Sequence, residues 1–206
     1  MTMPDKPKGY FSRLLVMDAE TSGISFDSKD PSFNAKMKRY YQSVSWGLIA
    51  VDVETLKPID ELYVEIQYDP NKYLWNERAE QVHGLSREYL ADKGLPEIEA
   101  VEEIGSFIYE HFGSEQRVPC AGHNVSSFDI YFMRSLLTPY EIMFETGSRF
   151  VDTNSIGFAC YGTYNSDDLF DMMGIPRDKH NALEDAHASL KVIRNTRLLY
   201  DKIING

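Results

Sequence analysis

Two carboxylates, Asp18 and Glu20, stand two residues apart where the apolar run in "VMDAETSG" (16–23) ends. On a β-strand, residues i and i+2 point to the same face, so the two acids would lie side by side. Adjacent carboxylates oppose each other's ionisation, and a bound Mg²⁺ or Mn²⁺ removes that penalty because hard cations take oxygen ligands. The pair is thus either a metal site or, as the spacing alone also allows, two exposed acids at a strand end.

A third acid, Asp129, ends the stretch "GHNVSSFD" (122–129) and falls on the first turns of a helix that follows a strand. Taken alone, its position is explained by the favourable interaction of a carboxylate with the positive end of a helix. Phe128 is expected to pack in the core rather than to stack on a ligand.

The last cluster is "HNALEDA" (180–186), which contains His180 and Asp185. A separation of five residues is not a helical repeat, so the two side chains cannot share one helix face. We expect His180 to lie on a loop and to reach over the site, while Asp185 enters it from the last helix. His187, two residues further on, would point elsewhere.

The elements that must position these residues form one α/β domain with a mixed sheet, in which an antiparallel meander precedes alternating helices and strands. Strands are expected at 11–17, 44–53, 61–67, 117–122 and 149–153. Helices are expected at 96–112, from a cap at Ser126 or Ser127 to Leu137, at 166–174, and from 181 to about 203.

The bulk composition limits the class of protein. A chain of 206 residues with 43% hydrophobic residues can bury one sizeable core. Its net charge of −11 argues against a broad basic surface that grips nucleic acid. Without a signal peptide or an apolar run long enough for a membrane, we expect a cytoplasmic protein with no membrane partner. The two cysteines, Cys120 and Cys160, are expected in the core.

Taken together, the clusters resemble the DEDDh family of 3′–5′ exonucleases, which have a ribonuclease H-like fold. The matching motifs are DxE at 18–20, HNxxxFD at 123–129 and HxxxxD at 180–185, and "VHGLS" (82–86) resembles a scaffold segment of the family. The resemblance is nearest to the proofreading epsilon subunit of bacterial DNA polymerase III and its stand-alone relatives. It implies an exonuclease domain at 11–203, with tails at 1–10 and 204–206.

This resemblance implies a metal-dependent enzyme that removes nucleoside 5′-monophosphates from the 3′ end of single-stranded DNA. Two divalent cations, Mg²⁺ or Mn²⁺, would be bound, and His180 would be the general base. The implied metal ligands are Asp18, Glu20, Asp129 and Asp185. The implied substrate contacts include Thr21, His83, Leu85 and Asn124.

One segment departs from the family pattern, a polar insertion at 25–43 between the first two strands. Its bases and aromatic residues could guide a single strand by charge and stacking, or the segment could be a tolerated surface insertion. The residues of this possible patch are Lys36, Lys38, Arg39, Tyr40 and Tyr41.

Two other functions stay open. Related enzymes act on short or structured RNA with the same five site residues, and sugar preference depends on pocket shape. A non-catalytic nucleic-acid-binding module is less favoured, because all five residues are present. A replication or repair partner is possible.

Overall fold

The computed structural model describes residues 11–24, 41–113, 117–176 and 181–205. His180 and most of the insertion, including Lys36, Lys38, Arg39 and Tyr40, lie outside the described residues.

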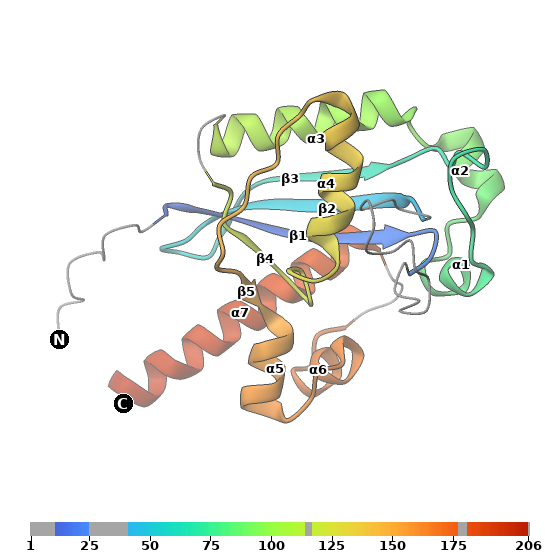
Figure 1. Cartoon of the computed structure of the whole chain (residues 1–206). Helices are drawn as coiled ribbons and strands as arrows, with labels where there is room; N and C mark the ends of the chain where they lie inside the picture. Colours follow the sequence, from blue (N-terminus) through green and yellow to red (C-terminus); the bar gives the residue numbers. More distant parts are fainter. Residues whose placement is uncertain (1–10, 25–40, 114–116, 177–180, 206) are drawn as a thin grey trace.

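The centre of the molecule is a five-stranded mixed sheet with the order β3-β2-β1-β4-β5 (Figure 1). β1, β2 and β3 form an antiparallel meander, whereas β4 and β5 run parallel to β1. The strands are β1 (Arg13–Thr21), β2 (Ser43–Asp52), β3 (Pro58–Glu65), β4 (Cys120–Gly122) and β5 (Val151–Asp152). The predicted mixed sheet and its meander are therefore confirmed.

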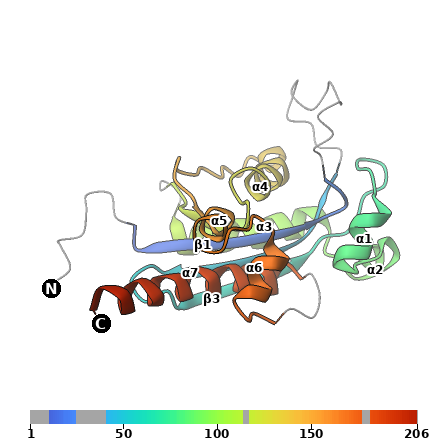
Figure 2. The same ribbon diagram turned by 90° about the horizontal axis from the view of Figure 1, so that it is seen from below.

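Helices cover both faces of the sheet, with α3 and α4 on one side and α7 on the other (Figure 2). The helices are α1 (Glu77–His83), α2 (Arg87–Lys93), α3 (Glu97–Phe112), α4 (Asp129–Leu137), α5 (Thr153–Tyr161), α6 (Ser166–Met172) and α7 (Ala182–Asn205). A 3₁₀ turn, η1 (Thr138–Tyr140), follows α4. Within the described part of the chain, no helix is long and apolar enough to cross a membrane.

The alternation of side chains along β1 divides the core into two layers. Leu15 and Met17 pack with residues of α3 and α4, while Leu14 and Val16 pack with residues of α7. Because the period of a strand is two residues, the even-numbered positions of β1 all face α7. That face is the one on which Asp18 and Glu20 lie.

Several expected boundaries were wrong. β1 continues through Asp18 and Glu20 to Thr21, because its ladder with β2 persists beyond the apolar run. The helix expected to be capped by Ser126 or Ser127 begins at Asp129 without a side-chain cap. Cys120 is buried as expected, but Cys160 is exposed on α5.

Candidate active site

The carboxyl-terminal half of β1 presents two acids toward the first turns of α7. Asp18 is half-buried and Glu20 is 9% exposed. Across the ladder, Asp18 lies opposite Gly47 of β2 and Glu20 lies opposite Ser45. The cross-strand neighbour of Asp18 therefore has no side chain, so this face of the sheet has room for another element beside Asp18.

The start of α7 lies directly on Gly47. A Cβ atom built on Gly47 would come within 2.3 Å of the backbone of Ala182 and Leu183. No real Cβ approaches backbone so closely, so only glycine allows α7 to lie this near the sheet. Asn181 caps the start of α7, since its side-chain oxygen accepts from the backbone N–H of Leu183 at 3.0 Å.

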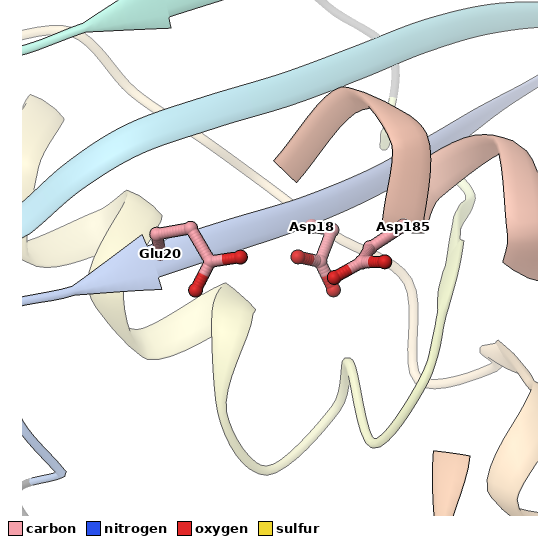
Figure 3. Close-up of side chains that lie close together, drawn as sticks. All are labelled: Asp18, Glu20 and Asp185. Atoms are coloured by element: carbon pink, nitrogen blue, oxygen red, sulfur yellow. The ribbon is translucent and has the colours of Figure 1, made fainter. Parts of the chain in front are cut away.

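This close contact places Asp185 beside the two acids of β1 (Figure 3). One carboxylate oxygen from each of Asp18, Glu20 and Asp185 lies within 4.8 Å of the others. Three carboxylates at this separation repel one another strongly unless a cation lies between them. Their oxygen atoms suit a hard divalent cation, so the donor set fits Mg²⁺ or Mn²⁺.

Asp129, the fourth predicted acid, enters where β4 ends. The pairing of β4 with β1 reaches only Val16 and Ala121, after which the chain leaves the sheet and returns as α4. Asp129 is the first residue of α4 and is 2% exposed. Its carboxylate accepts hydrogen bonds from its own backbone N–H and from that of Ala19.

The environment of Asp129 disfavours its charge. Burial raises the pKa of its carboxyl well above the usual value, and the charges of Asp152 and Glu20 raise it further. The two backbone hydrogen bonds act in the opposite direction but do not offset the burial. A nearby cation would favour the ionised form, which makes Asp129 a suitable fourth ligand.

The acids open into a pocket of about 250 Å³, whose wall includes Asn124, Phe128 and Phe170. Asn124, a predicted substrate contact, has a φ of 58°, and its N–H donates to Asp152 at 2.8 Å. Phe128 packs on the core as expected, with its ring 5.0 Å from that of Phe132, and also reaches the pocket.

His123 and His187 bind groups other than the four acids. The Nε2–H of His123 donates to the carbonyl of Tyr164 at 3.0 Å, and its Nδ1 lies 3.0 Å from the hydroxyl of Thr153. These bonds tie the pocket wall to α5 and to the segment before α6. His187 lies 3.1 Å from Glu61 of β3, away from the acids as predicted.

The other expected substrate contacts lie beyond the end of β1. The Thr21 hydroxyl donates to the Gly23 carbonyl at 3.0 Å. His83 is buried at the end of α1, where its Nδ1 accepts from the N–H of Leu85 at 3.0 Å and its ring meets Trp75 edge-on. Contact of Thr21, His83 and Leu85 with a substrate stays a prediction.

Three residues of this region were not predicted. Gly47 positions α7, Asp152 holds Asn124 and caps α5, and Ser189 lies in the pocket wall. A glycine inside an apolar strand and an aspartate just before a helix are each sequence signals. Ser189 follows Asp185 by four residues, which places both on one helix face.

Comparison with solved structures identifies the architecture. The chain aligns with E. coli exonuclease I in complex with a dT13 oligonucleotide at a TM-score of 0.72 and 17% identity, covering 95% of this chain and 43% of that one. Exonuclease I from Methylocaldum szegediense gives a TM-score of 0.69 and 21% identity, again over 95% of this chain and 43% of that one.

A zinc-bound complex of E. coli exonuclease I with single-stranded DNA gives a TM-score of 0.70 and 18% identity, over 94% of this chain and 43% of that one. The chain thus spans less than half the length of these exonuclease I chains. No family model and no curated protein matches the sequence. The predicted nearness to the epsilon subunit stays a prediction. The structural likeness establishes that the chain has the ribonuclease H-like fold found in exonuclease I.

Proposed function

We propose that this protein is a metal-dependent 3′–5′ exonuclease that removes nucleoside 5′-monophosphates from single-stranded DNA. The observation that carries the proposal is the convergence of Asp18, Glu20 and Asp185, with Asp129 behind them, on a fold shared with exonuclease I. Single-stranded DNA is favoured as the substrate because exonuclease I has been solved with dT13 and dA16 oligonucleotides.

The proposed cation ligands are the carboxylates of Asp18, Glu20, Asp129 and Asp185. Four carboxylates balance the charge of two divalent cations, Mg²⁺ or Mn²⁺. When bound, such cations activate a water molecule and stabilise the leaving oxygen of a phosphodiester. The sheet and α7 contribute by holding the acids in place, since each lies on a regular element with buried neighbours.

The proposed general base is His180, because an imidazole with an ordinary pKa near 6.5 can accept a proton at neutral pH. In the sequence it precedes Asn181, the residue that caps the start of α7. Asp185 lies on the first turn of the same helix. The proposed substrate contacts are Thr21, His83, Leu85 and Asn124, together with Lys38, Arg39 and Tyr40 of the insertion. A replication or repair partner is part of the same proposal.

The test is digestion of 5′-labelled single-stranded DNA and RNA of one sequence, in Mn²⁺, in Mg²⁺ and in EDTA. The wild type is expected to give a ladder that shortens from the 3′ end of DNA, and Asp18→Ala to give none. Glu102→Ala, an exposed acid on α3, is the matched control and should digest normally.

Faster digestion of RNA would replace the DNA proposal by an exoribonuclease. Binding of either polymer without any digestion would favour a non-catalytic binding module. A ladder that survives in Asp18→Ala would contradict the proposed site.

A further inference from the structure

Ser189 of α7 is a buried polar residue that the proposed chemistry has not used. Its side chain is 1% exposed, and it lies in the wall of the pocket that holds Asp18, Glu20 and Asp185. Its hydroxyl has no hydrogen-bond partner among the residues that the structure describes. A buried hydroxyl without a partner destabilises a fold, because its hydration is lost without replacement.

The geometry of α7 directs this residue toward the acids. Ser189 follows Asp185 by four residues, so it lies one turn along on the same helix face. The flanking residues Ala188 and Leu190 are instead packed in two apolar clusters. The polar position is therefore confined to the strip of the helix that borders the pocket.

A helical serine or threonine often satisfies its hydroxyl on the carbonyl one turn earlier. Thr196 does so on this same helix, where its Oγ1 donates to the carbonyl of Val192 at 2.9 Å. Ser189 makes no such bond. The hydrogen-bonding capacity of this hydroxyl is therefore unused by the described residues, although Ser189 lines the pocket.

We propose that the Ser189 hydroxyl holds a water molecule of a divalent cation bound by Asp18, Glu20 and Asp185, and so strengthens cation binding. The inference rests on the proposed function, whose metal site it deepens. Mg²⁺ keeps several water ligands when it binds to proteins, and these waters need hydrogen-bond acceptors. The serine oxygen supplies one, and its proton remains free to donate to a neighbouring oxygen. Ser189 is therefore a positioning residue that acts through water.

The experiment compares Ser189→Ala with the wild type in two measurements, Mn²⁺ affinity by titration calorimetry and thermal unfolding in EDTA. The variant is expected to raise the Mn²⁺ dissociation constant about tenfold, the lower end of the effect typical of residues that support metal ligands. Its melting temperature in EDTA should equal or exceed that of the wild type, because an unpartnered buried hydroxyl has been removed.

Ser106→Ala is the matched control for helix propensity, since Ser106 is an exposed serine inside α3. The change in melting temperature caused by Ser106→Ala is subtracted from that caused by Ser189→Ala. Ser106→Ala should leave the affinity for Mn²⁺ unchanged. Ser189→Thr keeps the hydroxyl and is expected to retain wild-type affinity for Mn²⁺. Retained affinity would show that the loss in Ser189→Ala comes from the missing hydroxyl and not from a folding defect caused by substitution at this position.

A Ser189→Ala variant that melts lower in EDTA but binds Mn²⁺ like the wild type would show a structural role and overturn the inference. In that case the proposed function would still stand, provided that the wild type binds Mn²⁺ and digests DNA. A wild type that neither binds Mn²⁺ nor digests nucleic acid would overturn both.

Discussion

Asp129 is an acid whose surroundings disfavour its charge. It is buried, and the charges of Asp152 and Glu20 act on it. A carboxyl group whose pKa is raised in the folded state binds its proton more tightly there than in the unfolded chain. Ionisation above the unfolded pKa, near 4, therefore lowers the stability of the metal-free protein at neutral pH.

Asp129→Asn should therefore raise the melting temperature at pH 7 in EDTA by a few degrees, while it abolishes cation binding. The amide oxygen can still accept the backbone hydrogen bonds, so the fold loses little. Differential scanning calorimetry checks the first effect and Mn²⁺ titration the second. Asp171→Asn, an exposed acid on α6, is the control and should change neither. A lower melting temperature for Asp129→Asn would mean that its charge stabilises the fold.

At the level of single residues, most of the acidic site could be predicted from the sequence. Two acids at strand spacing share a face, so Asp18 and Glu20 could be predicted from their separation alone. That Asp185 and Asp129 join them followed from a family resemblance, because nothing in local spacing links α7 or α4 to β1. The bond of Asp152 to Asn124 and the place of Ser189 in the pocket depend on tertiary contacts, which local sequence patterns do not encode.

At the scale of elements, the site depends on how closely α7 approaches β2. The contact is made at Gly47, where an added methyl group would lie 2.3 Å from the backbone of Ala182 and Leu183. Backbone cannot move aside as the end of a side chain can. Any side chain at position 47 must therefore displace the first turn of α7, which carries Asp185.

Gly47→Ala should accordingly lower the affinity for Mn²⁺ by about tenfold or more, since small misplacements of site groups are costly. Overpacking should also lower the free energy of unfolding by about 1–3 kcal/mol. Gly147→Ala is the control, because the nearest atom to its added Cβ is 3.8 Å away. Wild-type affinity in Gly47→Ala would show that this contact does not position Asp185.

The strands β1 to β3 and the helices α3 and α7 were predictable because each carries an apolar period over eight or more residues. The helices α1, α2 and α5 were not predicted, since seven to nine residues span only about two turns and show a weak apolar period. Length alone was not decisive, because α4 and α6 are equally short and were predicted. Their caps were present in the sequence: the side chains of Asn76, Ser86 and Asp152 accept from backbone N–H groups of the first turns. The full length of β1 was missed because its last residues are held by the ladder with β2 rather than by apolar burial.

At the scale of the whole molecule, Asp18, Glu20 and Asp185 share one pocket of a chain whose net charge is already −11. A divalent cation that binds only the folded chain must stabilise it by mass action. At a concentration roughly 100 times the dissociation constant, the gain is about 2.7 kcal/mol.

Mn²⁺ should therefore raise the melting temperature of the wild type by about 5–10 °C under that condition. Asp18→Asn should lose most of this shift, while Glu102→Asn should retain it. A calorimetric series with increasing Mn²⁺ checks both variants. An equal shift in Asp18→Asn would mean that the cation binds elsewhere.

The fold class could be predicted from the chain order of the motifs together with the meander that precedes them. The exonuclease I likeness then confirmed it with only 17–21% identity. Such low identity shows why local sequence patterns leave much open: the architecture is maintained by burial and register, which many different sequences satisfy.

Hydrolysis from a free 3′ end is best tested by identifying the first product of digestion. Single-stranded DNA carrying a label in its 3′-terminal nucleotide is digested with Mg²⁺, and the products are separated by chromatography over time. With Mg²⁺ the label is expected to be released at once as a nucleoside 5′-monophosphate, with no labelled oligonucleotide intermediates. In EDTA no label should be released. Release of a 3′-monophosphate, or of labelled internal fragments first, would contradict the proposed function.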